Sequence, residues 1–342
     1  MKKAFLTNKG EIKIQDVAKP TIEKDDDVII KPVRASVCGS DLWFFRGIDK
    51  PANDNSGHEM IGIVEETGKA ITTVKKGDFV IAPFTHGCGH CPACLAGFDG
   101  NCMNATDLWS SDAQAEYVRY QHAQWSLVKI PGQPADYTDG MLASLQALSD
   151  VMPTGYHAAR TADVQKGDTV VVIGDGAVGL CAVIGAKLRG AKRIILLSHH
   201  EDRAQLGREF GATDIVSERG DDATKKVQEL TNGNVDAALE CVGSRQAMEQ
   251  ALDVLRPGGR LGHVGVPHDE KFDLGTSFHK NVNIGGGTAA VTTYDKNFLL
   301  KDVLDGTINP GKVFTQTYSL DEIQQAYADM DKRKTIKSLL KF

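Results

Sequence analysis

Four of the seven cysteines in this chain lie close together, in the segment HGCGHCPACLAGFDGNC, residues 86–102. Cys88, Cys91, Cys94 and Cys102 have the spacing C-x2-C-x2-C-x7-C. Each two-residue gap lets a tight loop direct two thiolates to one point, and four thiolates match the tetrahedral coordination of structural zinc. Because four protein ligands leave no open position, we expect this site to stabilise the loop of residues 86–103 without catalysing a reaction.

A disulfide framework, a redox dithiol and an iron–sulfur cluster are the other uses of such a cysteine cluster. The N-terminal sequence MKKAFLTNKGEIKI has no apolar stretch of signal-peptide length, which predicts a cytoplasmic protein. Disulfides rarely persist in that compartment, and the spacing differs from that of ferredoxin cysteines. His86 and His90 lie close enough in the sequence to ligate, but four thiolates already fill the site. Zinc is therefore the favoured occupant.

A second group of potential metal ligands lies earlier in the chain. Cys38 occurs in VCGSDLW, and residues 57–71 follow with the pattern G-H-E-x2-G-x5-G-x2-I, which contains His58 and Glu59. Thiolate and imidazole groups are common ligands of zinc in proteins. A lone cysteine or histidine is usually structural, but these two contexts together favour a metal site.

A glycine-rich turn indicates a nucleotide-binding site. The segment VVVIGDGAVG, residues 170–179, has the pattern G-x-G-x-x-G after an expected strand and at the start of an expected helix. Glycine allows a tight turn there and lets backbone amides approach a pyrophosphate at the helix N-terminus. Within a strand–helix–strand unit the pattern predicts dinucleotide binding. The expected contacts are Gly174, Gly176, Val178 and Gly179.

The type of dinucleotide is selected at the end of the next strand, in LLSHHEDR, residues 196–203. An acid there would hold the ribose 2′-hydroxyl and would repel a 2′-phosphate. Ser198 occupies that position, followed by His199, His200 and Arg203. These side chains can donate hydrogen bonds to a phosphate, so the sequence favours NADP, with NAD as the alternative. The two acids between His200 and Arg203 oppose this preference, but we assign them to the first turn of the next helix, where acids are favoured.

The elements that position these motifs divide the chain into two domains, because 342 residues exceed one comfortable hydrophobic core. Residues 1–152 contain short runs rich in β-branched residues, such as VIIKPVRASV and KGDFVIAPF. Over residues 153–289 apolar strands and helical segments alternate, which predicts a parallel, doubly wound sheet. Residues 290–342 contain two helices that break this pattern, and we expect them to return to the first domain. The last segment, DKRKTIKSLLKF, is expected to be a strand with solvated lysines.

These motifs, together with RPGGR at residues 256–260, resemble those of the zinc-dependent alcohol dehydrogenases of the medium-chain dehydrogenase/reductase superfamily. The resemblance extends over the whole chain. It implies an α/β fold in which a GroES-like β-rich catalytic domain, residues 1–152 and 290–342, accompanies a Rossmann domain, residues 153–289. It also implies hydride transfer between an alcohol, or its ketone or aldehyde, and a nicotinamide cofactor. Two zinc ions per chain and a homo-oligomer, a tetramer rather than a dimer, are implied as well.

The resemblance assigns ligands to a catalytic zinc. They are Cys38, His58 and Asp150, and Glu59 matches a family glutamate that lies near the metal and can ligate it. One thiolate and one carboxylate would neutralise the charge of the ion and leave a Lewis acid with an open position, where an alcohol loses its proton more easily. Asp41 matches the carboxylate that holds the histidine ring through its other nitrogen.

Further residues are assigned by the same resemblance. Ser40 matches the hydroxyl that begins the family's proton relay. The relay usually ends at a histidine five residues after the cysteine, and Trp43 occupies that position, so the proton must leave through water or another group. Thr154 would contact the nicotinamide, and the turn VGVP, with Gly265 and Val266, would line the same ring.

Composition restricts the partners. The net charge of -6 argues against nucleic acid and anionic membranes, and no segment has the length of a membrane span. The expected partner is a small-molecule alcohol or carbonyl compound, whose pocket walls we expect around residues 43, 85–110 and 265–290. Two alternatives remain: a metal-independent quinone-type reductase of the same fold, and a non-catalytic NADP(H)-binding protein, which the tryptophan at position 43 would permit.

Overall fold

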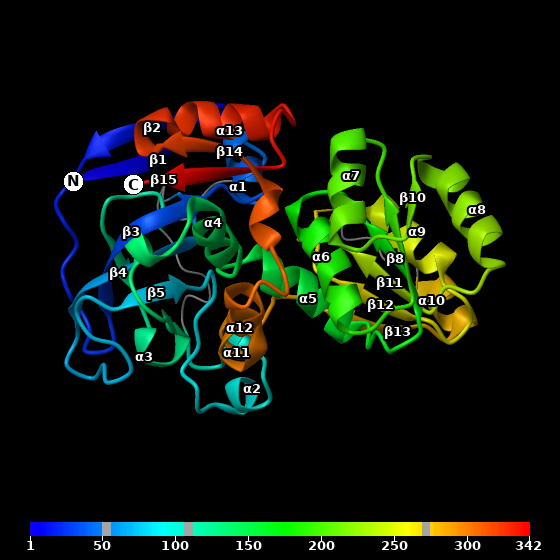
Figure 1. The fold of residues 1–342 in the computed structure, drawn as a ribbon, viewed down its shortest axis with the longest axis horizontal. Coiled ribbons are helices and arrows are strands. Elements are labelled where there is room, and N and C mark those ends of the chain that lie inside the picture. Colours follow the sequence, from blue (N-terminus) through cyan, green and yellow to red (C-terminus); the bar gives the residue numbers. More distant parts are fainter. Residues whose placement is uncertain (50–55, 106–111, 269–273) are drawn as a thin grey trace. The chain divides into compact units, whose positions relative to one another are not determined.

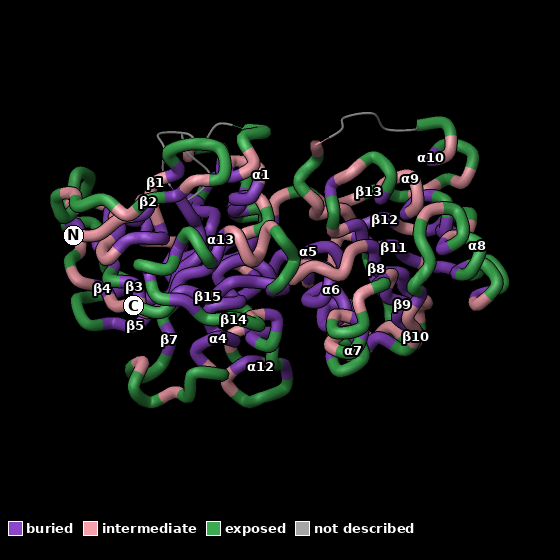
Figure 2. Tube along the Cα trace, turned by 90° about the horizontal axis from the view of Figure 1, so that it is seen from above, coloured by how far each residue is buried: buried purple, intermediate pink, exposed green. Residues whose placement is uncertain are grey.

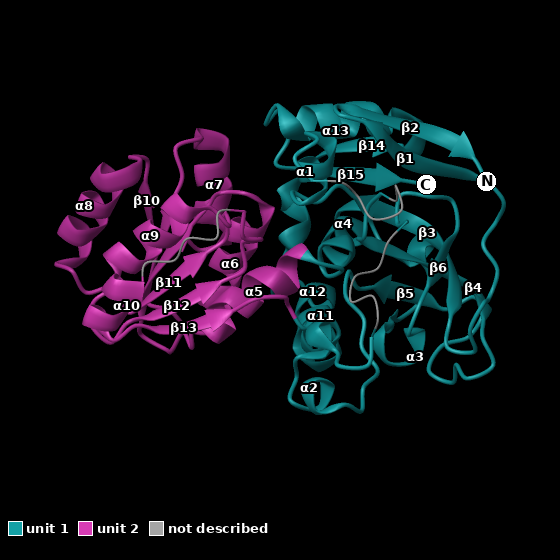
Figure 3. Ribbon diagram, turned by 180° about the vertical axis from the view of Figure 1, so that it is seen from behind, with its two compact units in different colours: residues 1–150, 290–342 teal, residues 151–289 magenta. Residues whose placement is uncertain are grey.

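The structure is a computed structural model, and it describes residues 1–49, 56–105, 112–268 and 274–342 (Figure 1). The chain forms two compact units (Figure 3). Unit 1 comprises Met1–Asp150 and Ala290–Phe342, and unit 2 comprises Val151–Ala289. The sequence placed the first boundary at residue 152. The units divide two residues earlier, because helix α5 (Val151–Thr161) is continuous and belongs to unit 2.

Unit 1 is built on a sheet of mainly antiparallel strands with the order β14-β15-β3-β4-β5-β7, in which β6 also pairs with β3. Ala35 near the end of β3 is paired with Met60 at the start of β4, so the loop after β3 lies beside the residues that precede β4. A separate hairpin joins β1 and β2. The strands are β1 (Lys2–Asn8), β2 (Glu11–Asp16), β3 (Val28–Ser36), β4 (Met60–Thr67), β5 (Phe79–Ala82), β6 (Val118–Tyr120), β7 (Val128–Ile130), β14 (Phe314–Ser319) and β15 (Lys337–Lys341).

Short helices surround this sheet. Phe45 of α1 packs against Tyr327 of α13, with ring centroids 5.4 Å apart, and both belong to the same hydrophobic core as the inward side chains of β3 and β4. This packing fixes the chain just after β3. The α-helices are α1 (Asp41–Phe45), α2 (Pro92–Leu95), α3 (Ala123–Ser126), α4 (Asp139–Ala147), α11 (Val291–Tyr294), α12 (Leu300–Leu304) and α13 (Ile323–Asp331). The shorter turns are η2 (Asp99–Asn101), η3 (Pro134–Asp136), the π-helical η4 (Asp295–Leu299), η5 (Pro310–Val313) and η6 (Leu320–Glu322).

Unit 2 contains a parallel sheet with the order β10-β9-β8-β11-β12-β13. Its central strands β8 and β11 are buried over nearly their whole length, because helices cover both faces of a doubly wound parallel sheet. Figure 2 shows these strands as buried and parts of α8 as exposed. The strands are β8 (Thr169–Ile173), β9 (Arg193–Leu197), β10 (Asp214–Val216), β11 (Ala237–Glu240), β12 (Arg260–His263) and β13 (Asn283–Gly286). The helices are α5 (Val151–Thr161), α6 (Ala177–Leu188), α7 (Glu201–Phe210), α8 (Gly220–Thr231), α9 (Arg245–Val254) and α10 (Leu274–Lys280).

The fold class predicted from the sequence, a β-rich domain with a doubly wound parallel sheet, is confirmed. The sequence did not predict α4 within the β-rich region, nor α10 and β13 at the end of unit 2. Residues 142–147 of α4 are all buried, polar Ser144 and Gln146 included, so no exposed polar face marks the helical period. Within the described part of the chain, no helix has both the length and the apolar character needed to cross a membrane.

Candidate metal centres and cofactor site

The first candidate metal centre lies in unit 1, where three segments of the chain meet. Cys38 follows β3 by two residues, His58 and Glu59 directly precede β4, and Asp150 follows α4. One ligand atom from each of these four residues lies within 4.8 Å of the others. The structure therefore brings together residues that are separated in the sequence by up to 112 positions.

The distances within this cluster suit a tetrahedral zinc ion. Nε2 of His58 is 3.4 Å from Oδ2 of Asp150, and Sγ of Cys38 is 3.5 Å from the same oxygen. Zinc bonds of about 2.0–2.3 Å separate tetrahedral ligands by roughly 3.3–3.8 Å, so these three atoms form one face of such a site. Oε1 of Glu59 lies farther away, 4.0 Å from Nε2 of His58.

Burial makes this cluster electrostatically dependent on a cation. Burial raises the pKa of the Cys38 thiol, and the charge of Asp150 raises it further. Burial alone would lower the pKa of His58, but Asp41 and Cys38 outweigh that effect and raise it well above its usual value. The Cys38 thiolate is thus less stable as an anion without a positive charge nearby, and a divalent metal ion would supply that charge.

Asp41 holds the histidine of this cluster in position. Its Oδ1 lies 3.5 Å from Nδ1 of His58, on the opposite side of the ring from the ligand nitrogen. Its Oδ2 accepts a hydrogen bond of 2.9 Å from the backbone N–H of Cys38. One carboxylate therefore contacts both ligand-bearing segments, as carboxylates behind metal-binding histidines commonly do.

Glu59 is held by a buried lysine that the sequence analysis interpreted wrongly. Lys337 of β15 was expected to be solvated, but its side chain is 1% exposed. Its Nζ donates to Oε1 of Glu59 at 2.6 Å and to the carbonyl of Val37 at 3.0 Å. The hydroxyl of Ser36 donates to the other oxygen of Glu59 at 2.5 Å, and Gln146 donates to that hydroxyl at 2.8 Å. The strand β15 pairs with β3, and its residues 337–340 are all buried, so Lys337 lies beside the segment that follows β3 instead of in solvent.

Ser40 and Trp43 lie beside this cluster in the sequence, at the start of α1. Ser40 precedes the helix, and its side chain makes no capping hydrogen bond to the helix N-terminus. Both residues are half-buried. The hydroxyl that the family resemblance assigns to a proton relay is therefore not used to stabilise the helix.

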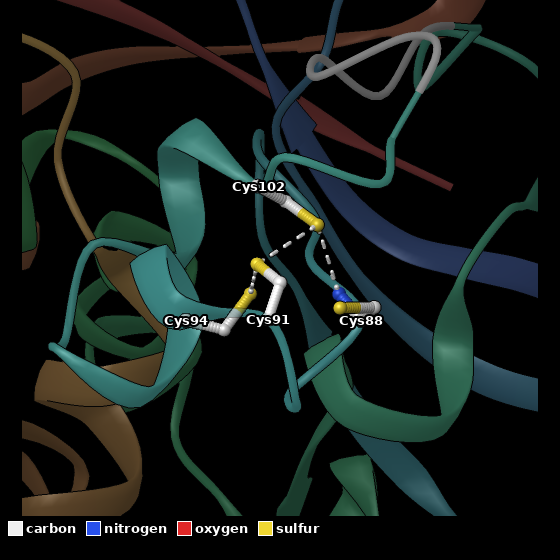
Figure 4. Close-up of side chains that lie close together, drawn as sticks. All are labelled: Cys88, Cys91, Cys94 and Cys102. Atoms are coloured by element: carbon white, nitrogen blue, oxygen red, sulfur yellow. Dashed lines mark hydrogen bonds between the residues drawn. The ribbon is translucent and has the colours of Figure 1, made fainter.

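The second candidate metal centre is the four-cysteine cluster. Figure 4 shows its side chains directed toward one another. The sulfur of Cys91 is 3.5 Å from that of Cys94 and 4.0 Å from that of Cys102, and all four sulfurs lie within 4.8 Å of one another. Zinc–sulfur bonds of about 2.3 Å separate tetrahedral sulfurs by roughly 3.8 Å, so the cluster matches a zinc site in shape. His86 and His90 are not part of the cluster.

The loop around these cysteines is shaped by backbone contacts. Backbone N–H groups of Cys94 and Met103 lower the pKa of Cys91 to about 6, whereas burial raises that of Cys94 to about 12. Gly89 has φ +76°, and a Cβ there would lie 2.5 Å from the ring of Trp125. The loop therefore requires glycine where it passes the tryptophan.

The glycine-rich turn of unit 2 lies between β8 and α6. A Cβ on Gly179 would lie 1.9 Å from the carbonyl oxygen of Gly174, so the first turn of α6 can approach the turn this closely only with glycine. A Cβ on Gly176 would meet no protein atom within 4 Å, which leaves open space beside the N-terminus of α6. This arrangement fits a pyrophosphate group, which binds backbone N–H groups at a helix N-terminus.

The end of β9 holds the residues expected to select the cofactor, together with one acid that was not expected. The hydroxyl of Ser198 donates to Oδ2 of Asp175 at 2.9 Å, and Arg203 lies 3.2 Å from Oδ1 of the same carboxylate. His199 and His200 stack with ring centroids 4.0 Å apart, and each has a ring nitrogen within 4.8 Å of the Asp175 carboxylate. The two acids that precede Arg203 form the first turn of α7, as expected.

The remaining cofactor residues lie elsewhere in unit 2. Thr154 lies on α5, and Gly265 and Val266 follow β12. A Cβ on Gly265 would lie 2.0 Å from the nitrogen of Gly243, so the turns after β11 and β12 are in contact. Glu240 stabilises the first of these turns, since its Oε1 accepts hydrogen bonds from the N–H groups of residues 242 and 243. The structure thus brings these two turns together next to the glycine-rich turn, where Val242 would contact a Cβ on Gly174.

Comparison with known proteins identifies the family of this chain. Residues 24–132 match the family described as "Alcohol dehydrogenase GroES-like domain", and residues 177–298 match "Zinc-binding dehydrogenase". An alcohol dehydrogenase of Cupriavidus necator is 32% identical over 96% of this chain and 94% of its own. An uncharacterized zinc-type alcohol dehydrogenase-like protein of Bacillus subtilis is 32% identical over 94% of each chain. The chain belongs to the zinc-dependent alcohol dehydrogenase family.

A solved structure agrees with this assignment. The zinc-dependent alcohol dehydrogenase 2 of Streptococcus pneumonia has a TM-score of 0.89 and 31% sequence identity, over 100% of this chain and 98% of its own. Members of this family of the medium-chain dehydrogenase/reductase superfamily are oxidoreductases that use zinc and a nicotinamide cofactor. Part of the substrate pocket expected from the sequence, residues 106–110 and 269–273, lies outside the described residues.

Three residues near these sites were missed by sequence reasoning. Lys337 is separated from Glu59 by 278 positions, and no local pattern distinguishes it from the exposed lysines around it. Asp175 fills a variable position between two glycines of the motif. Arg219, which precedes α8, contacts Nε2 of His199 from the end of the neighbouring strand β10. The order of strands in a doubly wound sheet could have suggested Arg219, because the end of β10 lies next to the end of β9.

Proposed function

We propose that this protein is a zinc-dependent alcohol dehydrogenase that interconverts an alcohol and its ketone or aldehyde, with NADP preferred over NAD. The observation that carries the proposal is the convergence of Cys38, His58 and Asp150 at 3.4–3.5 Å spacing in a buried part of unit 1. Three protein ligands with an open fourth position are typical of catalytic rather than structural zinc. The similarity to the alcohol dehydrogenase of Cupriavidus necator supports the same substrate class.

Each residue of the centre has a distinct role in this proposal. Bound zinc would act as a Lewis acid that makes an alcohol hydroxyl more acidic. Cys38 and Asp150 supply the negative charge that holds the ion, and Asp41 fixes the ring of His58. The hydroxyl of Ser40 would pass its own proton to water as it takes up the proton of the substrate, and Trp43, which cannot titrate, limits the size of the pocket. Glu59 stays bonded to Lys337 and acts as a ligand only when it leaves that partner.

The four-cysteine cluster is proposed to hold a second, structural zinc ion. Its four sulfurs leave no position for a substrate, and its role is to keep residues 86–103 in shape. Two zinc atoms per chain are therefore expected from elemental analysis. One atom or none per chain would favour a metal-independent quinone-type reductase of the same fold.

The preference for NADP rests on the positive groups around the end of β9. Ser198, His199, Arg203 and Arg219 all lie near the position that an acid occupies in NAD-binding sites. Turnover of a panel of primary alcohols, secondary alcohols, polyols and their carbonyl partners with each cofactor tests this. A higher kcat/KM with NAD than with NADP would contradict the preference and leave the zinc centre untouched.

Replacement of a ligand tests the zinc mechanism itself. Cys38→Ala is expected to lower kcat by about 100-fold or more, because loss even of groups behind the ligands costs 10- to 100-fold. NADPH binding, measured by fluorescence, should persist. The matched control is Cys181→Ala, a buried cysteine of α6 outside both clusters, which should keep its activity. Full turnover by Cys38→Ala would exclude the proposed mechanism, and absence of turnover in wild-type protein that carries zinc and binds NADPH would favour a non-catalytic role.

The family resemblance also leads us to propose a homo-oligomer, a tetramer rather than a dimer. Light scattering of the purified protein measures the mass directly, and a mass of one chain would contradict the proposal.

A further inference from the structure

We infer that Asp175 determines how strongly this protein prefers NADP: its carboxylate occupies the cradle of a 2′-phosphate and weakens the binding of that phosphate relative to a ribose hydroxyl. This inference rests on the proposed use of a nicotinamide cofactor by unit 2. It adds a specificity-determining residue that lies inside the glycine-rich turn and outside the segment in which selectivity is expected.

The groups expected to bind a phosphate are already bonded to an anion. Oδ2 of Asp175 accepts from the hydroxyl of Ser198 at 2.9 Å. Oδ1 lies 3.2 Å from Nη1 of Arg203, and the same guanidinium nitrogen is 3.4 Å from the backbone oxygen of Asp175. The ion pair is largely shielded from solvent, since the side chains of Arg203 and Asp175 are 11% and 15% exposed. Solvent therefore screens this carboxylate only in part.

Neighbouring nitrogen-bearing side chains define where an anion binds. Ring nitrogens of His199 and His200 lie within 4.8 Å of the Asp175 carboxylate. Arg219 contacts His199 and adds a second guanidinium to this surface. An Asp175–His199–His200 group could also ligate a cation, but two arginines beside it oppose a positive ion and favour a negative one.

The two cofactors would present different groups to the Asp175 carboxylate. A 2′-phosphate bound by Ser198 and Arg203 would share its donors with the Asp175 carboxylate, and two like charges at such a separation repel. A 2′-hydroxyl is a hydrogen-bond donor, and a carboxylate accepts from it. Asp175, in the glycine-rich turn, therefore takes the place of the acid that is missing at position 198 and favours binding of the 2′-hydroxyl. Arg203 and Arg219 favour binding of the 2′-phosphate. The balance between them sets the ratio of the two affinities.

The other acids nearby do not have this role. Glu201 is paired with Arg208 at 3.1 Å, and its side chain is 85% exposed. Asp214 is paired with Arg193 at 2.7 Å. Both residues lie at the N-terminal ends of their strands, whereas the glycine-rich turn follows the C-terminal end of β8. Asp214 thus provides a control of equal charge and similar pairing.

The test measures binding of two cofactor fragments to the full-length, zinc-loaded protein by calorimetry. The probes are adenosine 2′,5′-bisphosphate and adenosine 5′-monophosphate, which differ only in the 2′-phosphate. Asp175→Asn is expected to tighten binding of the bisphosphate by about tenfold or more, which corresponds to about 1.4 kcal/mol, and to leave the monophosphate unchanged or weaker. Asp214→Asn, which removes the same charge elsewhere, should leave the ratio of the two affinities unchanged.

The outcomes separate this inference from the proposed function. An unchanged ratio in Asp175→Asn, or equal tightening of both probes, would overturn the role of Asp175. Loss of a zinc ion from that variant would also overturn it, because the group would then be a metal site. Failure of the wild-type protein to bind either probe would instead overturn the proposed cofactor site, before any variant is compared. If Asp175→Asn does not fold, as judged by its melting temperature, Asp175→Ala removes the same charge. The same change in the ratio of the two affinities is then expected of Asp175→Ala.

Discussion

Lys337 and Glu59 form an ion pair in which the two side chains are 1% and 0% exposed. Two lysines near it in sequence differ completely: the side chains of Lys334 and Lys341 are 63% and 54% exposed. A buried ion pair is tolerated only when both charges are compensated, and here Ser36 and the carbonyl of Val37 complete the hydrogen bonding. Burial raises the pKa of Glu59 and Lys337 opposes that rise, so the pair favours the carboxylate form and holds it in a hydrogen bond beside the candidate metal ligands.

Removal of one partner should be far more costly than removal of both. Lys337→Met leaves the Glu59 carboxylate buried without its cation, and we expect a loss of about 3–5 kcal/mol in the free energy of unfolding. The double variant Lys337→Met with Glu59→Gln should recover part of that loss. Lys341→Met, on the same strand but exposed, should change stability by less than about 0.5 kcal/mol. Denaturant unfolding of the three variants measures these differences, and a double variant at least as destabilised as Lys337→Met would contradict the expected recovery.

At the scale of elements, the turn between β8 and α6 contains two glycines that are needed for different reasons. Gly179 is required by packing, since a Cβ there would meet the backbone of Gly174. Gly176 has open space at the same position and an ordinary extended backbone, with φ -75°. The same motif thus contains one glycine that the fold needs and one whose missing side chain leaves room only for a ligand.

Alanine at these two positions should therefore have different consequences. Gly179→Ala is expected to destabilise the protein by about 1–3 kcal/mol, because the contact is with backbone that cannot move aside cheaply. Gly176→Ala should keep the melting temperature and weaken NADPH binding about tenfold or more, because the methyl group would occupy the approach of the pyrophosphate. Thermal unfolding and fluorescence titration of both variants provide the comparison. Undiminished binding by Gly176→Ala would place the pyrophosphate elsewhere.

Elements and ligand sets differ in how far the sequence predicts them. The four-cysteine cluster was predicted from the local spacing of Cys88 to Cys102, whereas the set of Cys38, His58 and Asp150 was predicted from the family resemblance. The strands and helices of unit 2, apart from α10 and β13, were found because their periods change abruptly at glycines. Helix α4 was missed because its buried residues show no polar face. Asp175 and Lys337 were missed because their partners, Arg203 and Glu59, are fixed by the folded sheets and not by the spacing along the chain.

At the scale of the whole molecule, stability should depend on pH through a buried acid far from the metal ligands in sequence. Asp295 in η4 is 2% exposed, and neither of its carboxylate oxygens has a hydrogen-bond partner among the described residues. Burial, and then the charge of Asp99, raise its pKa well above the ordinary value of 3.8. The folded protein thus binds this proton more tightly than the unfolded chain does. Stability is complete below about pH 4 and falls as pH rises toward the folded-state pKa.

Asp295→Asn removes that dependence. At pH 8 we expect the variant to be more stable than the wild type, by about 1–3 kcal/mol, because an ionised or unsatisfied buried carboxyl is replaced by a neutral amide. The advantage should shrink as pH is lowered toward 4. Asp305→Asn is a control of opposite sign: Lys301 lowers the pKa of Asp305 to about 2, so its loss should slightly lower stability at pH 8. Melting temperatures between pH 4 and pH 8 decide the matter, and parallel curves for wild type and Asp295→Asn would contradict the assignment.

The pairing of β15 with β3 also affects the order in which the two units can fold during synthesis. A ribosome delivers Glu59 278 residues before Lys337, and the whole of unit 2 is synthesised in between. Because domains generally fold as they emerge, unit 2 has all its strands available while unit 1 still lacks β14 and β15. Until then the carboxylate of Glu59 has no cation to accompany it into the interior. The nascent chain can therefore form the ion pair between Glu59 and Lys337 only after all of unit 2 has been synthesised.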